Sequence, residues 1–254
     1  MKETTFNRIF NIFILVGMFT AVAYINAVRL SEPGARLLWQ GIATAGALAG
    51  VINVVLSAKG SIWNYLFGLI DVLAMTAVTL EASLGNPNPT WGLFAIHAFF
   101  LLPMQFIGFF QWRKRGATRE KQVQARRLSL KQWGLVILGF ALALPLLYWL
   151  LNFVGTENSP EFNTVIFFDT VVVALSVVAQ VLMALAFSDQ WILWICINIA
   201  SVALFWFKST SSTPDSYTVV YMIKYIFYFI NSLNGLRIWM GLSRHRGGDS
   251  CTTE

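Results

Sequence analysis

The sequence predicts an all-α, polytopic membrane protein with eight transmembrane helices. Hydrophobic residues make up 57% of its 254 residues and charged residues only 12%, and the mean hydropathy is +0.63. Apolar runs long enough to cross a bilayer recur along the whole chain, as in helical membrane proteins. The second half also repeats the polar pattern of the first half, which is how many transporters are built.

The apolar runs define the predicted spans in chain order. They lie near residues 6–28, 35–56, 61–80, 91–112, 131–151, 163–186, 190–207 and 217–241. The first run has no convincing small-residue cleavage site, so we expect it to remain as a helix. Within the second run, Gly46 and Gly50 have the spacing that permits close packing of helices.

Basic residues predict the orientation of these spans. The segment 113–131 and the tail with Arg244 and Arg246 are strongly basic, which places both in the cytoplasm. An even number of spans then puts the N-terminus inside as well. In this orientation the cytoplasmic segments carry fourteen Lys and Arg, and the external segments carry three. We interpret the net charge of +6 as a topology signal of a protein in a lipid bilayer, not as a nucleic-acid surface.

An ungapped overlay of the chain on itself reveals the repeat. The shift is the separation of Gly108 and Gly235, 127 residues, and it also superimposes Trp112 on Trp239. Each copy has three helices and one helix lies between the copies, so both copies run from outside to inside as parallel repeats. The predicted regions are an additional N-terminal helix at 1–30, a first repeat at 35–115, a basic loop and connecting helix at 116–155, a second repeat at 160–242, and a tail at 243–254.

Polar residues of the two copies align at three depths. The overlay pairs Asn53 with Gln180, Asp71 with Asn198, and His97 with Lys224. Buried polar groups in hydrocarbon are costly unless they have partners or line a watery cavity. We interpret the aligned residues as a solute path between the repeats. The alternative is that they are hydrogen bonds that hold helices together.

Trp191, Trp194 and Asn198 form the most specific local pattern. Steps of three and four residues put them on one helix face. Two indoles near an amide suit a flat aromatic solute, and a cationic ring would gain a cation–π interaction. The alternative is a tryptophan belt at the membrane surface, which fits Trp191 better than the deeper Trp194.

The first repeat keeps this spacing with different chemistry in Asn64, Phe67 and Asp71. Asp71 would be a counter-charge for a cationic solute or a protonation site, because an isolated carboxylate at low dielectric tends to become neutral. The alternative is that Asp71 pairs with a neighbouring helix.

Further polar residues are candidates for structural, gating or solute contacts. Asp169 and Lys224 lie at similar predicted depth and form an ion pair in one interpretation, while in the other Lys224 extends to the membrane surface. We group His97 with them as structural or gating residues. Asn231 and Asn234 lie near the predicted inner mouth, where they contact solute or neighbouring backbone.

Several motifs of enzymes and ATP-driven pumps are absent from the sequence. It has no Gly-x-x-x-x-Gly-Lys-Ser/Thr phosphate-binding loop, no Gly-x-Ser-x-Gly elbow and no His, Cys and carboxylate cluster with metal-ligand spacing. The two cysteines, Cys196 and Cys251, predict no disulfide framework. We therefore expect a transporter without cofactor, metal or catalytic residues, with downhill or ion-coupled transport.

Several segments resemble the PnuC family of vitamin-precursor transporters. They are residues 168–170, 175–180, 191–198 and 233–239 in the second repeat and 63–70 in the first. The resemblance spans roughly residues 40 to 245. It implies a three-plus-one-plus-three helix arrangement like that of SWEET proteins, in the bacterial inner membrane.

The resemblance also implies a function. Family members take up nicotinamide riboside by facilitated diffusion, and a cytoplasmic kinase traps the solute as its phosphate. The pyridinium ring, carboxamide and ribose hydroxyls of this solute would engage Trp191 and Trp194, Asn198, and the remaining amides respectively. Family members often have Asn where this chain has Asp71, so the extra negative charge is expected to adjust selectivity.

Two alternatives remain open at this point. Related branches of the family look like carriers of thiamine or riboflavin, and thiamine is also a ring cation. A membrane receptor or sensor would use the same pocket without moving solute. The sequence leaves the oligomeric state open, and exposed helix faces make a homo-oligomer possible.

Overall fold

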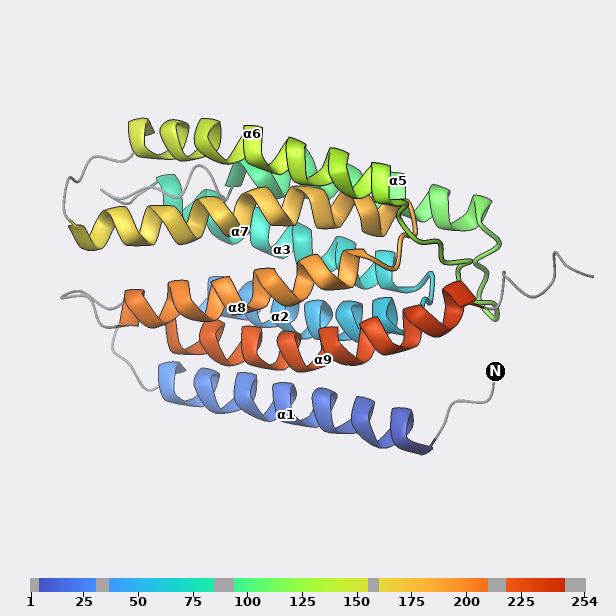
Figure 1. Cartoon of the computed structure of the whole chain (residues 1–254). Coiled ribbons are helices and arrows are strands. Elements are labelled where there is room, and N and C mark those ends of the chain that lie inside the picture. Colours follow the sequence, from blue (N-terminus) through green and yellow to red (C-terminus); the bar gives the residue numbers. More distant parts are fainter. Residues whose placement is uncertain (1–4, 31–36, 85–93, 155–159, 210–217, 245–254) are drawn as a thin grey trace, which may run out of the picture. The chain divides into compact units, whose positions relative to one another are not determined.

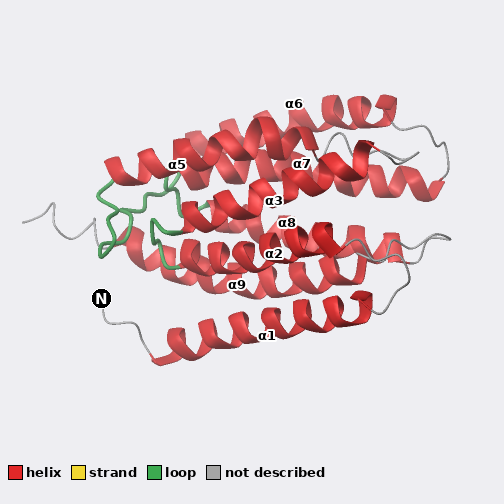
Figure 2. Cartoon of the chain, turned by 180° about the vertical axis from the view of Figure 1, so that it is seen from behind, coloured by secondary structure: helices red, strands yellow, loops and turns green. Residues whose placement is uncertain are grey.

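The computed structural model describes residues 5–30, 37–84, 94–154, 160–209 and 218–244, and these form an all-helical protein (Figures 1 and 2). No strand occurs among them, which confirms the predicted all-α class. The helices are α1 (Thr5–Leu30), α2 (Leu37–Ala58), α3 (Asn64–Leu84), η1 (Ile96–Leu101), α5 (Leu102–Lys114), α6 (Leu130–Val154), α7 (Pro160–Ala184), α8 (Gln190–Ser209) and α9 (Thr218–Arg244).

Several of these helices are apolar and long enough to cross a membrane. Within the described residues four meet both criteria, over Thr5–Tyr24, Leu37–Ala58, Asn64–Glu81 and Leu130–Leu150. Helix α6 is the clearest case, because Leu135, Leu138, Leu142, Leu146 and Trp149 are all exposed on it. Water would not stabilise such a surface, whereas lipid chains would.

The chain divides into two compact units, residues 1–122 and 123–254. In the first unit α2 packs on both α1 and α3, and α3 packs on η1 and α5. A Cβ on Gly46 would lie only 2.6 Å from the Cβ of Ala74, so the backbones of α2 and α3 approach closely at this glycine. This agrees with the predicted packing role of Gly46.

Glycines end two helices of the first unit. Gly60 has φ of 68° and Gly116 has φ of 77°, a left-handed conformation that costs glycine little. After α2, the N–H of Ser61 donates to the Leu56 carbonyl and that of Gly60 to the Ser57 carbonyl. This pair of bonds is the Schellman motif, which satisfies the last carbonyls of a helix and turns the chain sharply into α3.

A π-helical turn precedes α5. The N–H of Leu102 donates to the carbonyl of His97, five residues earlier, and Pro103 follows in the first turn of α5. Proline has no N–H and its ring crowds the preceding turn, so a widened turn before it relieves the conflict. His97 therefore contributes its backbone carbonyl to a break in helical regularity.

In the second unit α8 packs on both α7 and α9, and α6 packs on α7. The chain before α6 is bound to the α7–α8 turn. Arg126 stacks on Phe187 with the guanidinium carbon 3.8 Å from the ring centroid, and its Nε donates to the Leu185 carbonyl. The carboxylate of Asp189 accepts from the Leu128 N–H at 2.9 Å and from Trp133 Nε1 at 3.2 Å. This part of the basic segment is thus held in place.

Local signals also fix the start of α6. The Gln132 N–H donates to the Ser129 hydroxyl, and the Gln132 side-chain oxygen accepts from the Ser129 N–H. This reciprocal pair is a capping box and satisfies donors that the first helical turn leaves open. The capping bonds therefore stabilise the first turn of α6.

Candidate functional site

An aromatic ring covers a glycine of the last helix in each unit. In the first unit the Tyr65 ring lies against Gly108 and meets Trp112 edge to face, with ring centroids 5.1 Å apart. In the second unit the Trp191 ring lies 2.7 Å from where a Cβ of Gly235 would be, and meets Trp239 edge to face at 6.3 Å. The Gly-x-x-x-Trp sequence therefore builds the same local contact in both units.

This contact corrects the alignment of the two copies. Tyr65 and Trp191 are 126 residues apart, whereas the glycines and tryptophans of the last helix are 127 apart. The pattern of exposed residues on the middle helices also repeats after 126 residues. Leu66, Ile70 and Leu73 are exposed on α3, and their counterparts Ile192, Cys196 and Ile199 are exposed on α8. The second copy thus has one extra residue between its middle and last helices.

The correction changes which polar residues are equivalent. The shift of 126 matches Asp71 with Ile197 and Val72 with Asn198, so the predicted pairing of Asp71 with Asn198 was wrong by one residue. One residue corresponds to about 100° of helix rotation, and the two side chains take different positions within their units. The same shift matches Asn64 with Gln190.

Asn64 and Gln190 share an unusual environment. Both are fully buried, and neither side-chain amide has a hydrogen-bond partner among the described residues. Burying an amide without a partner is costly, so its presence at equivalent places in both copies indicates a role beyond packing. The sequence analysis named Asn64 but missed Gln190, because the ungapped overlay aligned Gln190 with Trp63.

Helices α8 and α9 form a polar cluster in the second unit. The Asn198 Nδ2 donates to the Ser232 hydroxyl at 2.9 Å, and that hydroxyl donates to the Tyr228 carbonyl at 2.8 Å. The bond fixes the orientation of the Asn198 amide through its Nδ2, and the amide Oδ1 has the chemistry of an acceptor for a solute N–H. Asn231 is buried on the same helix as Ser232.

Asn234 and Gln180 are also buried in the second unit. The Asn234 Oδ1 accepts from Nε and Nη2 of Arg237, at 3.2 and 2.8 Å. The Nε2 of Gln180 has no partner within the described residues. Asn234 is thus engaged by a neighbouring side chain, while Gln180 keeps a buried donor for another group.

The two tryptophans of α8 have different surroundings. Trp191 is 3% exposed and is enclosed by Gly235 and Trp239, as a packing residue would be. Trp194 is half-buried and packs against a cluster that includes Leu193 and Ile197. Of the two predicted stacking rings, Trp194 therefore has the ring with surface left for a solute.

The first unit has a polar cluster around Gly68. A Cβ on this glycine would lie 2.5 Å from Gln105 Oε1 and 3.3 Å from Asn53 Nδ2, so α2 and α5 bring their amides to the α3 backbone here. Asp71 is half-buried one turn further along α3 and lies close to Gly46 of α2. Phe67, which directly precedes Gly68, is also half-buried. Gln105 was missed by the sequence analysis, although it aligns with the equally polar Ser232.

The predicted gating residues are described in part. The Lys224 ammonium lies 5.2 Å from the centroid of the Tyr228 ring on the same helix, a cation–π arrangement. The side chain of Asp169 lies outside the described residues, so its predicted ion pair with Lys224 stays a prediction. Among the described residues no group of His, Cys, Asp and Glu is placed to hold a metal ion.

Apolar helices that carry buried amides, the half-buried Asp71 carboxylate and a half-buried tryptophan fit a membrane transporter of a small polar solute. Residues 40–241 match the family model described as nicotinamide mononucleotide transporter. The chain belongs to this family of membrane transporters, which are not enzymes.

Relatives of the chain carry consistent names. It is 32% identical over 214 residues to the nicotinamide riboside transporter PnuC of Neisseria mucosa, covering 82% of this chain and 74% of the relative. It is 30% identical over 204 residues to the PnuC of Haemophilus influenzae, covering 79% and 80%. A solved structure described as the vitamin B3 transporter PnuC superposes with a TM-score of 0.67 at 29% identity, covering 96% of this chain and 94% of that one.

Proposed function

We propose that the chain transports nicotinamide riboside across the bacterial inner membrane by facilitated diffusion. The observation that carries the proposal is the similarity over most of the chain to relatives named as transporters of this solute. A cytoplasmic kinase would trap the solute as its phosphate, and this would maintain the inward gradient.

The chemistry of the polar residues favours the riboside over the mononucleotide named in the family description. Nicotinamide riboside is a cation with a carboxamide and hydroxyls, and the candidate residues are amides and the carboxylate of Asp71. A phosphate is bound in proteins mainly by Arg, Lys and N–H groups. The basic groups beside the candidate residues are already engaged, because the Lys224 ammonium lies against Tyr228 and Arg237 donates to the Asn234 Oδ1.

We propose specific roles for the candidate residues. The half-exposed Trp194 stacks on the pyridinium ring, and the Asn198 Oδ1 accepts from the solute carboxamide. Asp71 balances the positive charge, while Asn53, Asn64, Gln180, Asn231 and Asn234 bind hydroxyls or waters along the path. Trp191 supports this surface by covering Gly235, and Phe67 contributes a solute-contacting ring from the first copy.

The proposed architecture has eight membrane crossings, with a three-helix repeat on each side of a connecting helix. The matching contacts of Tyr65 with Gly108 and of Trp191 with Gly235 support a duplicated unit. The two repeats would rock about a site between them and expose it alternately to each side, as in transporters with parallel repeats. Both termini would be cytoplasmic, since the basic segments follow the positive-inside rule.

Ligand binding and flux together test this function. Purified protein is heated with nicotinamide riboside, its mononucleotide, thiamine, riboflavin or nicotinamide. The riboside is expected to raise the melting temperature most, because only a ligand of the folded state stabilises it. A larger shift with thiamine would assign the chain to the thiamine branch, and one with the mononucleotide would favour the family description.

Flux separates a carrier from a sensor. Proteoliposomes without ATP or an ion gradient are expected to equilibrate labelled nicotinamide riboside with the outside. Binding without flux would identify a receptor, and flux that requires an ion gradient would reject facilitated diffusion.

A further inference from the structure

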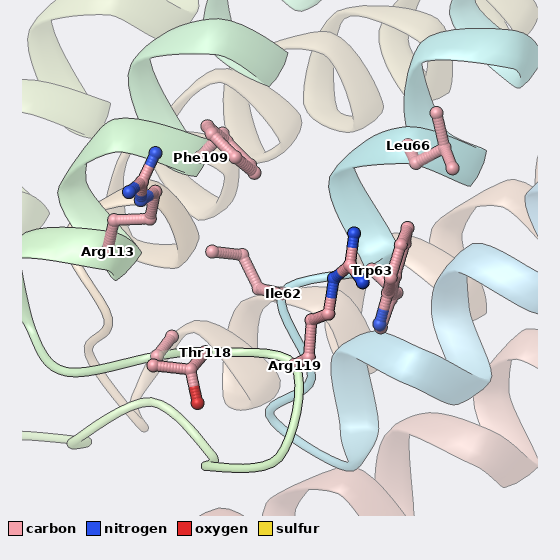
Figure 3. Close-up of a pocket in the computed structure, with 8 residues that line it drawn as sticks. Ile62, Trp63, Leu66, Phe109, Arg113, Thr118 and Arg119 are labelled. Carbon is pink, nitrogen blue, oxygen red and sulfur yellow. The ribbon is translucent and has the colours of Figure 1, made fainter.

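A pocket in the first unit lies outside the polar clusters described above. It has a volume of about 540 Å³ and is formed by the start of α3, the end of α5 and the loop that follows α5 (Figure 3). Ile62, Trp63, Leu66 and Phe109 form its apolar wall, and Arg113 and Arg119 supply its charge. The pocket is within the size range of a site for a small organic group.

Both arginines have a guanidinium placed for an anion. The Arg113 guanidinium lies 5.8 Å from the centroid of Phe109, and that of Arg119 lies 5.4 Å from the centroid of Trp63 (Figure 3). Neither has an ion pair with a described residue. A guanidinium that stacks on a ring by its face keeps N–H donors at its edge, where they bind phosphate oxygens in a forked geometry.

The loop that carries Arg119 is fixed before any ligand binds. The Thr118 hydroxyl accepts from the N–H groups of Glu120 and Lys121, at 3.3 and 3.1 Å. The Gln122 side chain donates to the Lys59 carbonyl at 2.8 Å, which ties the loop to the α2–α3 turn. Because these bonds already order the loop, a ligand would lose little binding energy in organising it.

The wall of the pocket continues as an apolar surface along the helices. Leu66 and Ile70 on α3 and Phe106 and Phe110 on α5 are all exposed. The opposite end is formed by the segment 113–122 of the same unit, which has five basic residues and one acidic residue, Glu120. The pocket thus joins an apolar helix surface to a positive loop, which is the arrangement of an acyl chain and an anionic headgroup.

We propose that this pocket binds the headgroup of an anionic phospholipid of the phosphatidylglycerol type. Arg113 and Arg119 hold the phosphate, Trp63 lies at the depth of the headgroup, and the acyl chains lie along α3 and α5. Basic pockets between helices at the membrane surface bind anionic lipids in this way. The leaflet follows from the proposed orientation and is cytoplasmic, whereas binding itself depends on neither the orientation nor the identity of the transported solute.

Native mass spectrometry of the full-length protein in detergent tests the proposal. Palmitoyl-oleoyl phosphatidylglycerol is titrated against phosphatidylcholine with the same chains. We expect one tight site for the glycerol lipid and none for the choline lipid. R113Q/R119Q is expected to lower the binding constant of that site about 30-fold, at ~1 kcal/mol for each basic side chain and ~1.4 kcal/mol per factor of ten.

The matched control is K114Q/K121Q, which removes two exposed charges from the same segment but leaves the pocket intact. It is expected to change the binding constant less than about threefold, because nonspecific attraction at the surface is screened by salt. An equal loss in both variants would mean a diffuse charge effect and would overturn the proposal.

A second measurement follows the fluorescence of Trp63. Brominated phosphatidylglycerol should quench the part of the tryptophan emission that W63F removes, and brominated phosphatidylcholine should not. Equal quenching by both lipids, or displacement of the bound lipid by millimolar inorganic phosphate, would overturn the proposal. So would a loss of oligomeric mass in R113Q/R119Q without any lipid effect, since the surface would then be a contact between copies of the chain.

Discussion

At the scale of single residues, Gly235 has no space for a side chain. G235A would place a Cβ 2.7 Å from the Trp191 ring, which is held in turn by Trp239. Such overpacking costs about 1–3 kcal/mol, more than the ~0.5–1 kcal/mol that alanine gains over glycine in a helix. We expect the melting temperature in detergent to fall by about 2–4 °C for each kcal/mol lost.

Gly241 is the matched control for this substitution. It lies on the same helix, and a Cβ there would have no atom within 4 Å. G241A is expected to leave the melting temperature unchanged or to raise it slightly. If G235A were as stable as G241A, the aromatic contact would not restrict this position.

Asn198 is a candidate-site residue whose amide is oriented by a neighbouring helix. Its Nδ2 is held by Ser232, and in the proposed site its Oδ1 accepts from the solute. N198A removes one hydrogen bond of about 1–1.5 kcal/mol, and we expect the dissociation constant for nicotinamide riboside to rise about tenfold. Isothermal titration on the purified protein measures this change.

The control for N198A is S201A, on the same helix and equally buried. The Ser201 hydroxyl has no partner among the described residues, so its removal is expected to leave the dissociation constant unaltered. Unchanged affinity in N198A would place the solute elsewhere. A loss of folding rather than of affinity would show that Asn198 serves the contact between α8 and α9.

At the scale of elements, Asp189 joins the chain before α6 to the turn before α8. D189A leaves the partly buried Leu128 N–H and Trp133 indole N–H without their acceptor, and each lost hydrogen bond costs about 0.5–1.5 kcal/mol. We expect a lower melting temperature and faster proteolysis between residues 126 and 130. E120A is the control, because this acidic side chain is exposed in the same basic segment. Equal proteolysis of both variants would contradict the role of Asp189 in holding the chain before α6.

The helices were easier to predict than their alignment. Lipid-facing segments must be apolar over a span and close their backbone hydrogen bonds internally, so hydropathy alone locates them. An overlay that is wrong by one residue leaves hydropathy nearly unchanged but moves a side chain to another helix face. That is why Asn198 was paired with Asp71, and why the equivalence of Asn64 and Gln190 became visible only through the contacts of Tyr65 and Trp191.

The same limit applies to the candidate site. The sequence identified Asn198 and Trp194 by their spacing, but it gave Trp191 the same role as Trp194. The difference between them depends on Gly235 and Trp239, which are far away in sequence and come into contact only through the packing of α8 on α9. Gln105 and Ser232 were missed because a single polar residue in an apolar run does not reveal which helix it faces.

At the scale of the whole molecule, the two copies share a scaffold but differ in chemistry. The aromatic contact with glycine is retained in both, whereas the first copy has a carboxylate at Asp71 and the second has an apolar residue at the equivalent Ile197. A scaffold that is conserved between copies would keep the motion of each repeat similar. An unequal set of polar groups suits an asymmetric solute that has a charged ring at one end and a sugar at the other.

The proposed alternating motion makes a prediction that simple binding does not. In a carrier, unlabelled solute inside competes with the entered label for the inward-facing site, so the label is carried out again less often than it is carried in. Proteoliposomes preloaded with unlabelled nicotinamide riboside should therefore take up labelled riboside transiently above its equilibrium level, without ATP or an ion gradient. Liposomes preloaded with the mononucleotide should show no such overshoot, because its phosphate would add negative charge to a proposed site that already holds the Asp71 carboxylate. A channel would equilibrate the label at the same rate with or without preloading, and that result would exclude alternating access.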